Sequence, residues 1–293
     1  MTERRLAGII APLTTPFDNA TGDIAPVHLR RNASRLLEAG LDGLVVAGST
    51  GEAPLLDPDE QRRLVSWVRE VVPDGRWLIA GTGAESTRQA IALTRAAAAE
   101  GADAVLVRPP SYFGPAHAPA SLVEHYRAVA DASPVPVLVY NIPQYTHLPL
   151  AAGLLQQLTG HPRIVGAKES SGDVKNLAAY RDAVPAWSLF VGTGSLLYAA
   201  LELGCEGGIL AVACFAPGVC VELRAAFQAG DRARAGALQE RLVPLSREIV
   251  GKLGPAGVKA AMDAAGLYGG PCRPPLSPVS AADRERVARL LAA

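Results

Sequence analysis

The sequence predicts an α/β fold, a (β/α)8 TIM barrel with a C-terminal helical extension. Eight short apolar runs lack polar alternation, which is typical of strands buried on both faces. Helical patterns separate these runs, and the strand pattern stops after about residue 225. We therefore expect a barrel domain at residues 1–225 and a helical domain at residues 226–293. The expected strands lie at residues 8–13, 43–48, 77–81, 104–108, 135–140, 164–168, 189–192 and 207–212.

The segments between the expected strands favour a closed barrel over an open, doubly wound sheet. Gly40 and Gly101 stand where a helix would end, just before the next strand. An open sheet typically carries a Gly-rich phosphate loop after its first strand, whereas here the first strand runs into TTPFDNATGD. We interpret the GTG segments at 81–83 and 192–194 as turn glycines, not as a dinucleotide fingerprint.

Composition excludes several classes of protein. With 49% hydrophobic and 19% charged residues, the chain of 293 residues is not a disordered protein. Lys plus Arg and Asp plus Glu both number 28, and this zero net charge argues against nucleic acid or a membrane as partner. The four cysteines include no C-x-x-C pair and suit neither a disulfide scaffold nor zinc. The longest apolar run, 208–221, is interrupted by Pro217 and cannot span a bilayer. Because the sparse cysteines suit a reducing compartment, we expect a cytoplasmic protein.

In a barrel of this type, function lies at the C-terminal ends of the strands. One lysine and two tyrosines stand there, with no histidine and no pair of acids, so we expect neither a metal nor a cofactor. Covalent chemistry by side chains is the remaining option. The eight strand ends are read at residues 14–15, 48–52, 81–83, 108–112, 140–141, 168–169, 192–194 and 210–211.

Lys168 ends the apolar run IVGAK and is the candidate nucleophile. The alternative is a lysine at the rim that pairs with Glu169. The chain uses 24 arginines and four lysines, so a charge needed only for solvation would usually be arginine here. Arginine keeps its proton, whereas a lysine in a desolvated barrel mouth can lose it, and a neutral amine attacks a keto group to form a Schiff base.

Two further strand ends suit such a reaction. Tyr140 ends the preceding strand, and neighbouring strands lie about 4.8 Å apart, so its hydroxyl can face Lys168 and move protons. The alternative is an amphipathic core tyrosine. Ser49 and Thr50 stand between glycines at a strand-to-helix turn, where hydroxyls and N–H groups can hold a carboxylate. The alternative is a plain turn with a Ser or Thr helix cap.

Four ordered motifs, GSTGE, YNIP, GAKESSGD and YGGPCRPPL, resemble the dihydrodipicolinate synthase / N-acetylneuraminate lyase family over nearly the whole chain. The resemblance implies an imine between Lys168 and pyruvate, with Tyr140 as the acid/base. It also implies that Ser49 and Thr50 hold the pyruvate carboxylate. Thr50 would link Tyr140 to a second tyrosine donated across a dimer interface, best matched by Tyr112. The remaining residues expected to border the substrate are Gly48, Tyr145, Gly192 and Ile209.

The resemblance implies keto-acid and aldehyde substrates and a homo-oligomer, a dimer of dimers. Dihydrodipicolinate synthases resemble one another in an arginine after the YN-x-P motif, which binds a carboxylate of the second substrate. Here Tyr145 stands at that position and His147 at the following glycine. A tyrosine supplies no bidentate cation. Sialate lyases usually carry an acidic pair after the seventh strand, whereas residues 192–195 contain none.

The segments SSGD (170–173), GTGS (192–195) and GVKAAMDAAGLYGGPCRPPL (257–276) look most like 4-hydroxy-2-oxoglutarate aldolases. This resemblance implies an enzyme that joins pyruvate to a short aldehyde such as glyoxylate or releases it. Arg108 is a candidate partner for the distal carboxylate. The alternative is 4-hydroxy-tetrahydrodipicolinate synthase, which condenses pyruvate with aspartate semialdehyde. A third hypothesis, a non-catalytic regulator that binds keto acids, is disfavoured because Lys168, Tyr140 and Thr50 occur together.

Overall fold

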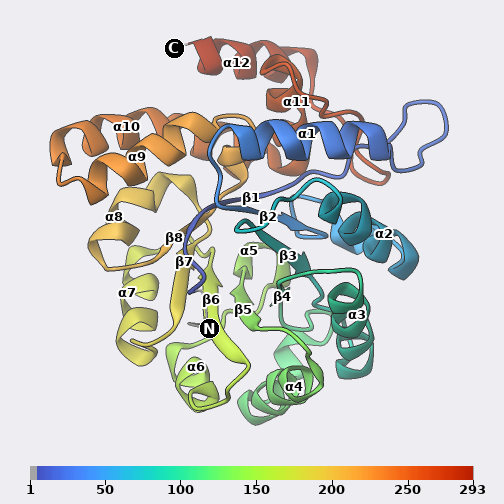
Figure 1. Cartoon of the computed structure of the whole chain (residues 1–293), viewed down its shortest axis with the longest axis vertical. Coiled ribbons are helices and arrows are strands. Elements are labelled where there is room, and N and C mark those ends of the chain that lie inside the picture. Colours follow the sequence, from blue (N-terminus) through green and yellow to red (C-terminus); the bar gives the residue numbers. More distant parts are fainter. Residues whose placement is uncertain (1–4, 293) are drawn as a thin grey trace.

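The computed structural model describes residues 5–292, and eight parallel strands close into a barrel surrounded by helices (Figure 1). Each strand pairs with the next, and β8 pairs with β1. Every strand overlaps one of the apolar runs read from the sequence, so the predicted barrel is confirmed. The strands are β1 (Gly8–Pro12), β2 (Gly43–Val46), β3 (Trp77–Gly81), β4 (Ala104–Val107), β5 (Val137–Asn141), β6 (Ile164–Glu169), β7 (Ser188–Val191) and β8 (Gly207–Ile209).

Helices follow the strands, and local signals set their ends. Asp57 caps the second helix in a reciprocal capping box with Glu60. Gly40 and Gly101 adopt φ angles of 94° and 95° directly after helices, as expected from their positions in the sequence. The helices of the barrel are α1 (Pro26–Glu38), α2 (Pro58–Arg69), α3 (Thr87–Ala99), α4 (Pro119–Ala132), α5 (Pro143–Thr146), α6 (Ala152–Leu158), α7 (Val174–Ala183) and α8 (Leu197–Glu202), with short 3-10 turns η1 (Ala53–Leu55), η2 (Gly114–Ala116), η3 (Gly194–Leu196) and η4 (Ala211–Cys214).

The C-terminal helices gather at one side of the barrel, near α1 in Figure 1. They are α9 (Pro217–Gln228), α10 (Arg232–Pro244), the π-helix η5 (Leu245–Gly251), α11 (Lys252–Ala264) and α12 (Ala281–Ala292). The boundary expected between residues 225 and 226 falls inside α9. Leu242, Ile249 and Val258 join the same apolar cluster as the barrel helices. A division into two domains stays a prediction.

Apolar side chains form two clusters, one inside the barrel and one between the strands and the helices. Strands β5 and β6 show both faces: Leu138 and Tyr140 point inward, whereas Val139 and Ala167 pack under the helices. Burial on both faces explains why the apolar runs lack polar alternation. Among the helices of residues 5–292, none combines the length and apolarity needed to span a membrane.

The register between β5 and β6 shifts by one residue after Val137. Val137 lies opposite Ile164, whereas the next residue, Leu138, lies opposite Gly166. Such a shift moves all following side chains of one strand relative to the other. It brings Tyr140 opposite Lys168 at the C-terminal end of the two strands.

Gly81 lets the end of β3 approach the turn after β2. A Cβ atom at this position would lie 2.1 Å from the carbonyl oxygen of Ala47 and 2.8 Å from its carbonyl carbon. We expect Gly81→Ala to displace the turn and to lower the free energy of unfolding by about 1–3 kcal/mol. Urea unfolding followed by circular dichroism measures this change.

Gly236→Ala is the matched control, because Gly236 lies in α10 and a Cβ there meets no atom within 4 Å. This substitution should stabilise the protein by up to about 1 kcal/mol through helix propensity. Equal stability of the two variants would show that β3 and the turn have room to separate.

Candidate active site

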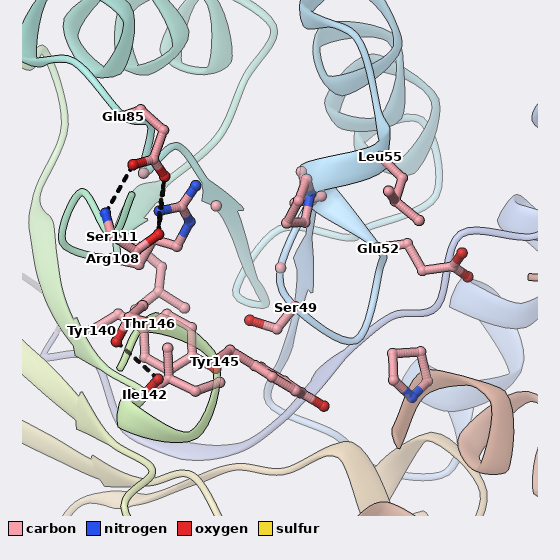
Figure 2. Close-up of a pocket in the computed structure, with 18 of the residues that line it drawn as sticks. Ser49, Glu52, Leu55, Glu85, Arg108, Ser111, Tyr140, Ile142, Tyr145 and Thr146 are labelled. Atoms are coloured by element: carbon pink, nitrogen blue, oxygen red, sulfur yellow. Dashed lines mark hydrogen bonds and ion pairs between the residues drawn. The ribbon is translucent and has the colours of Figure 1, made fainter. Parts of the chain in front are cut away.

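Two adjoining cavities lie at the C-terminal ends of the strands. The first, of about 460 Å³, is bordered by Lys168 and is called the Lys168 cavity. The second, of about 400 Å³, is bordered by Arg108 and Glu85 and is called the outer cavity (Figure 2). Both are bordered by Ser49, Tyr140, Ile142, Tyr145 and Pro255.

Lys168 and Tyr140 both border the Lys168 cavity. Their Cα atoms are partners in the pairing of β5 with β6, and Lys168 Nζ donates a hydrogen bond of 3.2 Å to Tyr140 Oη. Both side chains are buried, and Lys168 is only 5% exposed. The structure thus brings together the amine and the phenol that the sequence placed on neighbouring strands.

Glu169 points away from Lys168. Its Oε1 accepts hydrogen bonds from Asn141 Nδ2 at 3.0 Å, Asn176 Nδ2 at 3.0 Å and the Ser171 N–H at 2.8 Å. Consecutive strand residues face opposite sides, so the two side chains diverge. Within residues 5–292, Lys168 Nζ has no carboxylate oxygen within 4 Å. The alternative of a rim lysine paired with Glu169 is therefore wrong.

The turn at residues 48–52 brings Ser49 and Thr50 to the Lys168 cavity. Two non-glycine residues with left-handed backbones bracket this turn, Ala47 with φ 52° and Glu52 with φ 59°. Such residues are uncommon and cluster at functional sites. The capping residue of α2 is Asp57, so the alternative of a Ser or Thr helix cap is wrong.

The hydroxyls of Ser49 and Thr50 make no hydrogen bond with another group in the part of the chain that the structure describes. They are thus open to a ligand in the cavity. Thr50 is also not bonded to Tyr140 there, so the expected relay from Thr50 to Tyr140 stays a prediction.

Of the other expected site residues, three border a cavity and two do not. Gly48 borders the outer cavity, Gly192 the Lys168 cavity and Tyr145 both. Ile209 borders neither, because its side chain is fully buried in the apolar cluster inside the barrel. Ala211, two residues later, reaches the Lys168 cavity instead. A place for Ile209 next to the substrate stays a prediction.

Tyr112 lies outside both cavities of its own chain. Its side chain is 80% exposed and packs edge-to-face on Phe113, with ring centroids 4.9 Å apart. Its backbone N–H donates to Glu85 Oε2 at 2.8 Å. A role for Tyr112 in the site of a second copy stays a prediction.

Arg108 borders the outer cavity but already has a carboxylate partner. Its Nη1 lies 2.8 Å from Glu85 Oε1 (Figure 2). Burial of Glu85 opposes ionisation, but the N–H groups of Tyr112 and Ser111 and the Arg108 guanidinium outweigh it and lower the pKa of Glu85 to about 2. The sequence reading missed Glu85, because it belongs to the loop after β3 and meets Arg108 only in the folded chain.

The sequence also did not predict a second ion pair, between Glu52 and Lys259. Glu52 Oε1 lies 2.5 Å from Lys259 Nζ, and both side chains are almost fully buried. Burial lowers the pKa of Lys259, an effect that the charge of Glu52 opposes. The scarcity of lysine was the one signal that pointed to Lys259. Ser246, Pro255 and other residues of the C-terminal helices border the Lys168 cavity.

The titratable side chains of the site do not cluster as metal ligands do. Across residues 5–292, the structure contains no group of three or more His, Cys, Asp or Glu side chains that could hold a metal ion. The side chains that border the cavity include a buried amine, a phenol and several hydroxyls. This set can form an imine with a keto acid and hold its carboxylate.

Comparison with known proteins agrees with this chemistry. The model of the dihydrodipicolinate synthetase family matches residues 5–293. An uncharacterized DapA-like lyase of Halobacterium salinarum is 40% identical over 284 residues, which cover 95% of this chain and 91% of that protein. A 4-hydroxy-tetrahydrodipicolinate synthase of Synechococcus elongatus is 37% identical over 286 residues, which cover 97% of this chain and 94% of that protein.

A solved structure of the same family is also similar to this chain. YagE of E. coli K12, a member of the dihydrodipicolinic acid synthase family in complex with pyruvate, has a TM-score of 0.92, 29% identity and 98% coverage of both chains. The chain therefore belongs to the dihydrodipicolinate synthetase family and is a lyase of the class I aldolase type.

Proposed function

We propose that the protein forms a Schiff base between Lys168 and pyruvate, without a further cofactor, and uses it to make or break a carbon–carbon bond. The observation that carries this proposal is the hydrogen bond of 3.2 Å between Lys168 Nζ and Tyr140 Oη in a buried cavity. Lys168 lacks a carboxylate partner among residues 5–292, which leaves its amine available for attack.

In this proposal, neutral Lys168 Nζ attacks C2 of pyruvate to give a carbinolamine. A proton passes from the nitrogen to the oxygen of the carbinolamine by way of Tyr140. Tyr140 then donates its own proton to this hydroxyl, which leaves as water, so that a positive imine and a Tyr140 phenolate remain. The phenolate takes a proton from the pyruvate methyl group, which gives a neutral enamine. The enamine carbon attacks the aldehyde carbonyl, whose oxygen receives the proton from Tyr140, and hydrolysis of the new imine releases the product and restores Lys168. Cleavage follows the same steps in reverse.

The turn at residues 48–52 supports a place for the pyruvate carboxylate. Ser49 and Thr50 border the Lys168 cavity, and their hydroxyls make no hydrogen bond with any group of residues 5–292. Hydroxyl and backbone N–H groups of a turn can hold an anion next to a positive imine. We assign the carboxylate to this turn and the keto carbon to Lys168.

The second substrate is most strongly supported as aspartate semialdehyde. Several curated relatives at 36–37% identity are named 4-hydroxy-tetrahydrodipicolinate synthases. The sequence motifs favour 4-hydroxy-2-oxoglutarate as the substrate, whereas the names of these relatives favour aspartate semialdehyde. It remains a second candidate for one reason. Tyr145 borders both cavities at the position where the resemblance places an arginine in synthases, and Arg108 is already bound to Glu85.

For the exposed Tyr112 we propose a place at an interface between two copies of the chain. The adjacent rings of Tyr112 and Phe113 are both exposed, next to Ser111 at the rim of the outer cavity. Large exposed aromatic side chains are common at such interfaces. We propose a dimer of dimers as the assembly.

Pyruvate and borohydride together should add a covalent group to Lys168. The expected mass gain is that of pyruvate less one water plus two hydrogens, because borohydride reduces the imine. Peptide mapping by mass spectrometry locates the adduct. Lys168→Arg should lose both the adduct and turnover, because a guanidinium is not a nucleophile at neutral pH.

Lys175→Arg is the matched control, since Lys175 is exposed in α7, shortly after β6. It should keep both activity and adduct. An adduct mapped to Lys175, Lys252 or Lys259 in the wild type would contradict the assignment.

Tyr140→Phe should slow imine formation about 10²–10⁴-fold, the usual worth of a general acid/base group, and should leave the fold intact. Tyr180→Phe is the control, because the buried Tyr180 hydroxyl donates to the Leu150 carbonyl outside the cavities. That control should lose about 1 kcal/mol of stability at unchanged kcat. Stopped-flow imine formation and thermal unfolding separate the two effects. If Tyr140→Phe kept full kcat, its hydroxyl would be structural.

The wild type should condense pyruvate with aspartate semialdehyde at a higher kcat/KM than it cleaves 4-hydroxy-2-oxoglutarate. Tyr145→Arg adds a guanidinium, and Tyr145→Phe removes only the hydroxyl as its control. If another group already binds the second carboxylate, Tyr145→Arg should change kcat/KM only a few-fold. A 10–100-fold gain in condensation, the size of a missing charged hydrogen bond, would support the second candidate.

A further inference from the structure

Two of the four lysines are buried, and their surroundings differ. Lys168 has no carboxylate within 4 Å in the described part of the chain, whereas Lys259, 1% exposed, pairs with Glu52 at 2.5 Å. Lys259 Nζ also donates to the carbonyl oxygen of Pro271 at 2.6 Å. A buried ion pair is weak evidence for stability, because desolvation offsets its attraction. A role in arranging a particular geometry is the better account of such a pair.

Glu52 ends the turn that presents Ser49 and Thr50. Its backbone N–H donates to the Ser49 carbonyl at 3.1 Å. Its φ and ψ of 59° and 31° are left-handed, a conformation that the backbone alone would assign to glycine. Figure 2 shows the Glu52 carboxylate pointing away from Ser49 and Tyr140, so the carboxylate does not face the reacting groups.

Backbone groups of the C-terminal motif YGGPCRPPL form hydrogen bonds with both members of this ion pair. The Arg273 N–H donates to Glu52 Oε2 at 2.8 Å, and Pro271 accepts from Lys259. A Cβ on Gly269 would lie 2.0 Å from the Lys259 carbonyl oxygen, so the motif packs directly on the backbone of α11. Tyr268 Oη donates to the Phe17 carbonyl at 2.9 Å. The turn after β2 and the C-terminal segment 259–273 therefore meet at one buried ion pair.

We propose that the Glu52–Lys259 pair is a positioning device that holds the turn at residues 48–52 against α11. It thereby sets where Ser49 and Thr50 stand relative to Lys168. This inference rests on the proposed function, in which these hydroxyls receive the pyruvate carboxylate. Glu52 borders the outer cavity, but its side chain is fully buried, so Glu52 and Lys259 act on pyruvate through the turn. Their loss should weaken pyruvate binding and leave the Lys168–Tyr140 pair in place.

The main test compares Glu52→Gln with Glu60→Gln. Glu60 binds the Arg273 guanidinium at 2.6 and 2.7 Å, so the two variants make the same chemical change toward the same C-terminal segment. We expect Glu52→Gln to raise the KM for pyruvate about 10–100-fold with kcat changed only a few-fold, because small misplacements cost about that much. Glu60→Gln should lower Tm at an unchanged KM. Equal KM values for the two variants would overturn the proposal.

Hydrogen exchange gives a readout besides activity. The N–H groups of Gly51, Glu52 and Ala53 bond to carbonyls within the turn. Mass spectrometry should find faster exchange of this segment in Glu52→Gln than in Glu60→Gln. Unchanged exchange in Glu52→Gln would show that the ion pair does not hold the turn.

Two further variants distinguish the effect of the Glu52 carboxylate from the effect of backbone shape and from loss of folding. Glu52→Gly relieves the left-handed backbone but removes the carboxylate, so we expect a raised KM. A wild-type KM there would show that backbone shape alone sets the turn. Glu52→Gln with Lys259→Met leaves no unpaired buried charge, so it should fold and still show the raised KM. A wild-type KM in this double variant would also overturn the proposal.

Borohydride trapping at saturating pyruvate distinguishes this inference from the proposed function. If both hold, every folded variant forms the Lys168 adduct, and Glu52→Gln needs more pyruvate to reach it. If the wild type forms no adduct on Lys168, the proposed function fails, and hydrogen exchange still decides whether the pair holds the turn.

Discussion

The register of β6 against β5 is the constraint on which the site depends. One extra residue in β6 after the Val137–Ile164 pair brings Tyr140 opposite Lys168. Without this shift, Tyr140 would lie opposite Ala167, which packs under the helices. Parallel strands in a closed barrel have no free edge along which to slip, so the register is held on both sides. The spacing of 3.2 Å between amine and phenol is thus a consequence of sheet pairing.

The two buried lysines, Lys168 and Lys259, have different neighbours. Around Lys168 the neighbours are a phenol and hydroxyls, and Glu169 is turned away to bind Asn141 and Asn176. Around Lys259 a carboxylate and a carbonyl satisfy the ammonium group. A buried ammonium group needs such partners, whereas the surroundings of Lys168 suit the nucleophile that we propose.

The C-terminal extension is part of the site as well as a cover for the barrel. Ser246, Pro255 and Val258 border the Lys168 cavity, and Lys259 reaches the turn after β2. Pro255 follows Gly254, whose φ of 57° and ψ of −148° break the helix next to the Tyr145 hydroxyl. This arrangement gives the YGGPCRPPL motif a physical role, because its backbone groups satisfy the buried charges of Glu52 and Lys259.

By itself, the sequence determined the eight strands, the helix ends at Gly40 and Gly101, and the positions of Lys168 and Tyr140 at strand ends. These features follow from local periodicity, turn residues and chain order, which neighbouring residues encode. Only the tertiary structure decided that Ile209 is buried inside the barrel, that Tyr112 is exposed, and that Arg108 binds Glu85. It also decided that the backbone N–H of Arg273 meets Glu52 from 221 positions away. Such contacts depend on how strands and helices close around one core, and no local pattern records which distant partners that closure brings together.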